Sequence, residues 1–200
     1  MPFETRRTLL AGFAVLGLAA TVRVSAANDV MLVDDFSNSD LVAPSGNRWR
    51  GVTDRVMGGV STGSVRHETL DGRDALRMTG TVSLENNGGF VQAAIDLGAG
   101  GNLVDVSAFE GIQVTVRGNG ERYSVHLKTA DTARPWQSYR AHFVAGKDWT
   151  TVSLPFRDFE AYRVDEPLDL RRLRRLGLVA IGRVFEADLA VAKIAFYRPV

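Results

Sequence analysis

The chain offers few side chains that could carry out acid–base or nucleophilic catalysis. It has three histidines, His67, His126 and His142, and no cysteine. A serine nucleophile needs a histidine that an acidic residue orients, and zinc sites use closely spaced histidines or cysteines. Neither an H-x-H nor an H-E-x-x-H pattern occurs, and His126 and His142 alternate with apolar residues, so both are expected to face solvent on strands. We therefore predict no catalytic residue, no metal site, no cofactor and no enzymatic activity.

Aromatic side chains suit binding better than these histidines suit catalysis. Trp136 follows Arg134-Pro135, and Trp149 follows the turn Gly146-Lys147-Asp148. Trp149 shares the polar face of its expected strand. An exposed aromatic ring can stack on a sugar or anchor a protein partner. It can also simply cover the edge of a sheet, and both interpretations remain open for these two residues.

Two charged clusters are further candidates for binding. Asp34 and Asp35 could supply oxygen ligands to calcium, but no regularly spaced acidic loop accompanies them, so capping and solvation are expected. The second cluster lies in Asp169–Leu176, where we expect one helical turn capped by Asp169. Its four arginines could meet an anionic partner or form a solvated surface; they are Arg171, Arg172, Arg174 and Arg175.

Composition narrows the class of protein that must position these groups. A chain of 200 residues with 45% hydrophobic and 24% charged residues is typical of one globular domain. The absence of cysteine excludes disulfide scaffolds, zinc fingers and iron–sulfur clusters. A formal net charge of +1 provides no general attraction to nucleic acid. We therefore expect no nucleic-acid partner.

The first 26 residues are typical of a cleavable export signal. Arg6 and Arg7 precede an uninterrupted run of apolar and small residues from Ala11 to Val22, and Val24-Ser25-Ala26 offers a cleavage site. The adjacent arginines favour a twin-arginine signal; the alternative is an ordinary secretory signal. The run is too short for a permanent transmembrane helix. We predict an exported, periplasmic protein whose mature domain comprises residues 27–200.

Alternation of apolar and polar residues with period two recurs along the mature chain and predicts strands that are buried on one face. Such runs lie at residues 76–84, 91–97, 112–116, 123–127, 139–143 and 152–156. Residues 178–181 and 194–196 are apolar on both faces and are expected deep in a sheet. Gly118-Asn119-Gly120 leads into a strand, which predicts a hairpin turn and not a phosphate-binding loop. About ten short strands without a long helix predict an all-β sandwich or jelly roll.

Several short strings together resemble one known family. The string Thr53 to Ser61, T-D-R-V-M-G-G-V-S, is similar to the D-x-V-M-G-G-x-S signature of the NADH:ubiquinone oxidoreductase intermediate-associated protein 30 family. Asp34-Asp35-Phe36 and Trp49 precede it as in that family. Leu84 to Phe90, L-E-N-N-G-G-F, resembles the family's N-N-G-G-F segment. Further similar segments follow at Gly118–Tyr123 and Trp149–Phe156, so the resemblance covers about Asp34 to Tyr197.

The resemblance implies a galactose-binding-like β-sandwich with a non-enzymatic role. It implies binding of partly assembled membrane-protein subunits, or of a carbohydrate-type ligand. The glycines of the two longest matching strings allow positive φ and close backbone approach, and Met57 offers an adaptable apolar contact. Two such loops could form a shared binding surface or could only lock neighbouring strands. The candidate binding residues are Trp49, Asp54, Met57, Gly58, Gly59, Ser61, Asn86, Asn87, Gly88, Gly89, Trp136 and Trp149.

Two functions follow from these observations. The first is an assembly factor or chaperone for a membrane or envelope protein complex, which predicts an exposed apolar patch ringed by polar residues. The alternative is a periplasmic carbohydrate-binding module that uses Trp136, Trp149 and loop amides. That alternative predicts a concave cluster of exposed aromatic rings beside Asn, Asp or Arg side chains.

Overall fold

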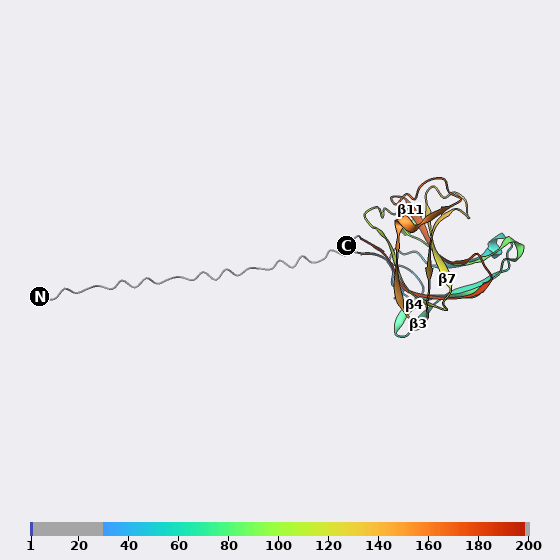
Figure 1. Cartoon of the computed structure of the whole chain (residues 1–200), viewed down its shortest axis with the longest axis horizontal. Coiled ribbons are helices and arrows are strands. Elements are labelled where there is room, and N and C mark those ends of the chain that lie inside the picture. Colours follow the sequence, from blue (N-terminus) through green and yellow to red (C-terminus); the bar gives the residue numbers. More distant parts are fainter. Residues whose placement is uncertain (2–29, 199–200) are drawn as a thin grey trace.

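The structure is a computed structural model that describes residue 1 and residues 30–198. The predicted export signal at residues 1–26 lies, apart from Met1, outside the described residues. Residues 30–198 form two antiparallel six-stranded sheets packed face to face (Figure 1). No helix among the described residues is long and apolar enough to cross a membrane.

The first sheet is built around its longest strand, β12, and is called the β12 sheet here. Its strands are β3 (Thr62–Leu70), β4 (Arg73–Val82), β12 (Phe185–Tyr197), β6 (Gly111–Gly118) and β9 (Thr150–Pro155), in that order. β1 (Val30–Asp34) pairs with the end of β12 beyond β4. The apolar run at residues 194–196 therefore lies inside a sheet, as its two apolar faces predicted.

The second sheet, called the β11 sheet, carries the candidate site. Its order is β10 (Glu160–Tyr162), β8 (Ser138–Val144), β7 (Arg122–Thr129), β11 (Leu173–Ile181), β5 (Phe90–Asp96) and β2 (Arg50–Thr53). The run at residues 178–181 belongs to β11, which is paired on both edges. Short 3-10 helices complete the elements: η1 (Asp54–Met57), η2 (Glu85–Asn87), η3 (Ala99–Gly101) and η4 (Phe156–Asp158).

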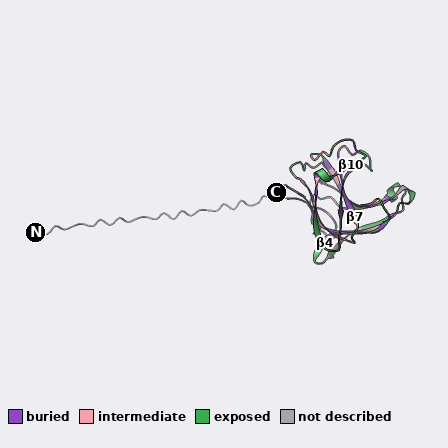
Figure 2. Cartoon of the chain, in the orientation of Figure 1, coloured by how far each residue is buried: buried purple, intermediate pink, exposed green. Residues whose placement is uncertain are grey.

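Alternation along the strands places apolar side chains between the two sheets. On β7, Tyr123, Val125 and Leu127 point into this core, and all three are at most 1% exposed. Buried residues accordingly concentrate in the inner strands, whereas the edge strands β3 and β10 contain no buried residue (Figure 2). The predicted all-β sandwich is confirmed. The largest core side chains include Phe36, Leu76, Met78, Ile95, Ile112, Tyr123, Tyr139 and Phe196.

The predicted hairpin at Gly118-Asn119-Gly120 is wrong. β6 pairs with β12 and β9, and β7 pairs with β8 and β11, so these residues cross from one sheet to the other. The Tyr123 hydroxyl stabilises the crossing, since it donates to Asn119 Oδ1 at 2.7 Å and accepts from the Asp188 N–H at 2.9 Å. Local glycines predict a turn, but long-range pairing decides between a hairpin and a crossing.

The predicted helical turn at Asp169–Leu176 is also wrong. β11 already begins at Leu173, which pairs with Thr129 of β7. Asp169 accepts the N–H of Arg171 at 3.0 Å, so it caps a tight turn before the strand. The four arginines therefore form no helical patch: the first two are exposed in the turn, and the last two lie on β11. Pairing on both edges of β11 outweighs the local helical preference.

Candidate functional site

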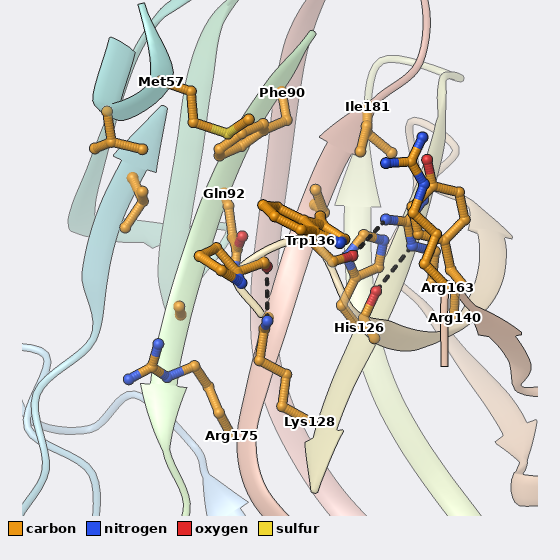
Figure 3. A pocket seen from close by; sticks show the side chains of 18 residues that line it. Met57, Phe90, Gln92, His126, Lys128, Trp136, Arg140, Arg163, Arg175 and Ile181 are labelled. Carbon is orange, nitrogen blue, oxygen red and sulfur yellow. Dashed lines mark hydrogen bonds between the residues drawn. The ribbon is translucent and has the colours of Figure 1, made fainter. Parts of the chain in front are cut away.

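A cleft of about 730 Å³ lies on the face of the β11 sheet that points away from the core. All six strands of the β11 sheet contribute its floor and one side, and η1 closes the other side (Figure 3). Its lining consists of Val52, Val56, Met57, Phe90, Gln92, Ala94, His126, Lys128, Pro135, Trp136, Ser138, Arg140, Tyr162, Arg163, Arg175, Gly177, Val179 and Ile181.

Small side chains keep the floor of this cleft low. Ala94 on β5 and Gly177 on β11 lie in register near the middle of the sheet. A Cβ atom on Gly177 would approach the side-chain Nε2 of Gln92 to 2.4 Å. Any larger residue at position 177 would therefore push Gln92 aside and take up space in the cleft.

Trp136 projects into the cleft from the loop between β7 and β8, and it is 44% exposed. The ammonium group of Lys128 holds this loop, because it donates to the carbonyl oxygens of Pro135 at 2.7 Å, Gln137 at 2.9 Å and Arg134 at 3.3 Å. Burial lowers the pKa of Lys128 to about 8, with the nearby arginines 174, 175 and 140 adding to the effect. The three carbonyl acceptors favour the charged form.

Two arginines flank the ring of Tyr162 at the β10 edge of the cleft. The guanidinium carbon of Arg140 lies 3.5 Å from the Tyr162 ring centroid, and that of Arg163 lies 5.4 Å from it. Arg140 also donates from Nε to Ser138 Oγ at 2.9 Å. Because Arg140 stacks on Tyr162, Trp136 is the aromatic ring left more open to a ligand.

His126 lies in the cleft floor and is only 8% exposed, so the expectation that it faces solvent is wrong. Its side chain does point away from the core, as alternation predicted, but the cleft walls cover it. Burial lowers the pKa of His126 to about 3, and Arg140, His142 and Lys128 lower it further. The ring is therefore neutral at neutral pH. His142 is exposed, as expected.

The contact between His126 and Ser124 has no catalytic geometry. Ser124 Oγ lies 3.0 Å from His126 Nε2, but Ser124 is 0% exposed. No described acidic side chain hydrogen-bonds to the His126 ring to orient it. The pair therefore lacks both access to a substrate and the third member that nucleophilic catalysis requires.

The string Thr53 to Ser61 takes part in a buried hydrogen-bond network around one carboxylate, called the Asp54 network here. Asp54, which is 1% exposed, accepts hydrogen bonds from the Ser61 N–H at 2.9 Å, the Ser61 hydroxyl, and the N–H groups of Gly89 and Phe90. Burial alone would raise the pKa of Asp54, but these hydrogen bonds together lower it. The Asp54 network joins the η1 loop to the η2 loop at one end of the sandwich, where Figure 1 shows the two loops projecting together.

The glycines of both loops leave room for the carboxylate of the Asp54 network. A Cβ on Gly59 would lie 2.4 Å from Asp54 Cγ, and one on Gly88 would lie 2.5 Å from Asp54 Oδ2. Gly58 has φ +89°, a left-handed conformation that ends η1. The loops could form a binding surface or only lock neighbouring strands. The contacts of Asp54, Gly59 and Gly88 fit the second interpretation. The apolar side chains of Val56 and Met57 remain outside, 72% and 57% exposed, at the edge of the cleft.

Residues 59–63, G-V-S-T-G, match the G-x-S-x-G pattern of hydrolase nucleophiles. In those enzymes the serine is exposed on a sharp turn from a strand into a helix. Here Ser61 is 0% exposed, donates to Asp54 and leads into β3. Ser61 therefore has a structural role, and its match to the pattern does not indicate a nucleophile.

The remaining predicted site residues lie apart from the cleft. Trp49 is 3% exposed and donates from Nε1 to Asp34 Oδ2 at 2.8 Å, so it is a core residue. Trp149 precedes β9 in the other sheet, with the Arg73 guanidinium 5.8 Å from its ring centroid. Asn86 is exposed at φ +55° in η2, next to Asn87. Of the predicted residues, only Met57 and Trp136 meet in the cleft.

Sequence reasoning did not identify most of the cleft. Gln92, Lys128, Arg140, Tyr162 and Arg163 come from four separate segments. The first four share one signal, a polar or aromatic residue on the solvent-facing side of a strand, which is common on any sheet, and Arg163 follows the end of β10. Among the described residues, no group of three or more His, Cys, Asp or Glu side chains could hold a metal ion.

Comparison with known families agrees with the motifs. The family described as complex I intermediate-associated protein 30 (CIA30) matches residues 35–191. The chain belongs to the CIA30 family. This match includes the Asp54 network, the η2 loop and the whole cleft lining, and it confirms the resemblance that the five sequence segments indicated. No curated protein matches the chain.

Solved structures similar to this CIA30 chain include carbohydrate-binding modules. The family 11 module of the cellulase Lic26A-Cel5E of Clostridium thermocellum has a TM-score of 0.65 and 14% identity, over 85% of this chain and 95% of that one. The family 30 module of Cel9D-Cel44B of the same organism has a TM-score of 0.61 and 15% identity, over 84% and 98%. At such identities the likeness establishes the galactose-binding-like jelly-roll fold and nothing further.

Proposed function

We propose that this chain is a non-enzymatic binding protein that holds an extended carbohydrate in the cleft of the β11 sheet. The observation that carries the proposal is Trp136, an exposed indole ring held over an open cleft beside side chains that can hydrogen-bond to hydroxyl groups. Sugar rings present apolar C–H faces that stack on aromatic rings, and their hydroxyl groups need polar partners.

The geometry of the cleft suits this ligand class. Its volume of about 730 Å³ is within the usual range for ligand sites, roughly 300–1,000 Å³. Gln92, Arg140 and Ser138 supply amide, guanidinium and hydroxyl groups along the floor. The three carbonyl contacts of Lys128 fix the Trp136 loop before a ligand arrives, which lowers the entropy cost of binding.

Titration with oligosaccharides tests the proposal. The mature protein, residues 27–200, is titrated by calorimetry and tryptophan fluorescence with a panel of neutral and acidic hexasaccharides. The panel includes the β-1,3-1,4-mixed-linked type found with the family 11 module of Clostridium thermocellum. We expect at least one member to bind, and Trp136→Ala to weaken its binding at least tenfold, since aromatic anchors commonly carry over 1.4 kcal/mol.

Trp149→Ala is the matched control, because Trp149 lies outside the cleft, just before β9 of the other sheet. It should leave the affinity within about twofold, well below the tenfold change that corresponds to 1.4 kcal/mol. A folded protein that binds no member of the panel contradicts the proposal. Equal losses in the two tryptophan variants contradict the assignment of the cleft.

A second candidate function is that of an assembly factor for a membrane or envelope protein complex. Family membership suggests it, and one observation favours it. The two loops joined by Asp54 expose four apolar side chains, called the signature tip: Val56, Met57, Val60 and Leu84. Apolar side chains exposed on a fixed loop are typical of sites that dock a protein partner.

Site-specific crosslinking tests this second function. A photoreactive amino acid replaces Val56 on the signature tip or Asp71, which is exposed in the turn between β3 and β4. In its own membranes, the protein should crosslink to subunits of a membrane complex from position 56 only. Identical products from both positions, or none from position 56, contradict the assembly role.

A further inference from the structure

The edge of the cleft at β10 brings two positive charges onto one aromatic ring. Arg140 on β8 and Arg163, just after β10, lie 3.5 Å and 5.4 Å from the centroid of Tyr162. Figure 3 shows the two arginines side by side at this edge of the cleft. Burial lowers the pKa of Arg140, and the positive charge of Arg163 adds to this lowering, so an anion would stabilise the pair.

Neither guanidinium is neutralised by a described acidic residue. None of the ion pairs among residues 30–198 includes Arg140 or Arg163. Glu160 lies opposite Arg140 in the register of β8 and β10, but it forms no ion pair with it. The third arginine of the cleft, Arg175, is already paired with Asp96 at 2.7 Å. The lining of the cleft contains no aspartate or glutamate.

The two arginines retain donors that could reach a ligand. Arg140 donates from Nε to Ser138 and from Nη2 to the Trp136 carbonyl, at 2.9 and 3.5 Å. A guanidinium has five N–H donors, so three remain. The guanidinium of Arg163 makes no hydrogen bond to any other described residue. An arginine fork with free parallel N–H groups matches a carboxylate in two-point geometry.

Backbone strain at Arg163 supports a functional role for this position. Arg163 has φ +54°, in the left-handed region that residues with a side chain rarely adopt. Its carbonyl oxygen accepts the side-chain amide of Gln137 at 2.9 Å, from the loop that carries Trp136. Strained backbone of this kind persists where the surrounding structure holds it, and it gathers at ligand sites. The Trp136 loop and the arginine pair are thus joined by two contacts.

From this arrangement we infer that the cleft selects an acidic glycan, with a hexuronate ring against Trp136 and its carboxylate on Arg140 and Arg163. The inference rests on the proposed carbohydrate function and specifies its ligand class. A neutral glycan would leave both charges without a counter-ion in a partly covered site. A uronate carboxylate would neutralise them and make charge-assisted hydrogen bonds, which are stronger than those of hydroxyl groups.

Matched pairs of ligands test the inference directly. Hexasaccharides of galacturonate, mannuronate and guluronate are each compared with their carboxyl-reduced forms, which keep the same rings and linkages without the charge. Calorimetry is performed at low and at moderate salt. We expect at least one uronate to bind tenfold or more tightly than its reduced form, and this preference to shrink as salt screens the ion pair.

The outcomes separate this inference from the function on which it rests. If the reduced or other neutral hexasaccharides bind as well as the uronates, the cleft binds carbohydrate but the acidic preference is wrong. If no oligosaccharide binds to folded protein, the carbohydrate function itself is wrong, and the inference falls with it.

Arginine variants test whether the preference for uronates depends on Arg163. Arg163→Gln should reduce affinity for the uronate about tenfold and change affinity for its reduced form less than twofold, as expected for one lost charge-assisted contact. Arg171→Gln is the control, because Arg171 is equally exposed but lies outside the cleft. An unchanged uronate preference in folded Arg163→Gln contradicts the assigned carboxylate site.

Discussion

The carboxylate of Asp54 shows how single residues of this chain hold distant segments together. It accepts N–H groups from Ser61 and from Gly89, which lies 35 residues away in the sequence. Gly59 and Gly88 leave room for it, since a Cβ on either would collide with the carboxylate. The buried residues of the family string are therefore structural, whereas the side chains of Val56 and Met57 are exposed at the edge of the cleft.

Asp54→Asn should destabilise the fold by about 3 kcal/mol, because an amide cannot accept every hydrogen bond that the buried carboxylate accepts. Urea unfolding followed by tryptophan fluorescence measures the change. The pKa of Asp54 lies below its ordinary value, so the stability that the carboxylate contributes is present at neutral pH. It is lost as the pH falls through that lowered pKa. Asp71→Asn, at an exposed turn, is the control and should change stability by less than about 0.5 kcal/mol.

Lys128 acts through Trp136, and we expect its charge to govern ligand affinity. Lys128→Met removes the ammonium that joins three carbonyl groups of the Trp136 loop. Affinity for any cleft ligand should fall about tenfold, roughly the effect of one charged hydrogen-bond donor. Protease cleavage in residues 130–137 should become faster.

The pH dependence of binding provides a second measure of Lys128. Because its pKa is lowered to about 8, wild-type affinity should decline as the pH rises from 7 to 9 and the ammonium loses its proton. Arg140, Arg174 and Arg175 are the charged groups around it, and arginines stay protonated in this range. The decline should be absent in Lys128→Met; a decline of equal size in the variant contradicts the assignment.

At the scale of elements, β11 lies in the middle of its sheet and contributes four residues to the cleft lining. Its neighbours β5 and β7 pair with it on both edges, which overrides the helical preference expected at Asp169–Leu176. Alternation along β7 correctly predicted which side chains enter the core. It did not predict that the opposite face is a cleft, because period two reports only that a residue points away from the core, not what covers it.

Gly177→Val should close the middle of the cleft without harming the fold. The new side chain would displace the flexible end of Gln92, and a β-branched residue suits a strand. We expect ligand affinity to fall at least tenfold, over 1.4 kcal/mol, while the melting temperature changes by only a few degrees. Gly146→Val is the matched control, since a Cβ there meets no atom within 4 Å. Full affinity in folded Gly177→Val contradicts the position of the site.

On the scale of the whole molecule, one end of the sandwich and the open face of the β11 sheet offer two surfaces that share an edge. The signature tip projects at one end (Figure 1), and the cleft extends from η1 across all six strands of the β11 sheet to β10. Val56 and Met57 belong to both, so a partner on the tip and a ligand in the cleft would meet at these two residues. A periplasmic location, which stays a prediction, would give both surfaces access to envelope components.

Replacing Arg6 and Arg7 by lysine tests the predicted location. If residues 1–26 are a twin-arginine signal, the double variant should remain as a full-length precursor in the cytosol, because that route depends on the adjacent arginines. Cell fractionation and the size of the protein measure this. Export of the double variant at the normal level indicates an ordinary secretory signal. A wild-type protein that stays uncleaved in the cytosol contradicts export altogether.

The amino-acid sequence by itself determined most of the strands, the β-sandwich and the family, because alternation and glycine turns are local properties of consecutive residues. Residues 91–97, 123–127 and 178–181 all lie in or across the strands where the pattern placed them. The tertiary structure alone decided which strands share a sheet, that Gly118–Gly120 crosses between layers, and that Trp136 and Trp149 flank strands of different sheets. The cleft joins residues from Val52 to Ile181, and contacts across such separations depend on strand pairing, which no local pattern encodes.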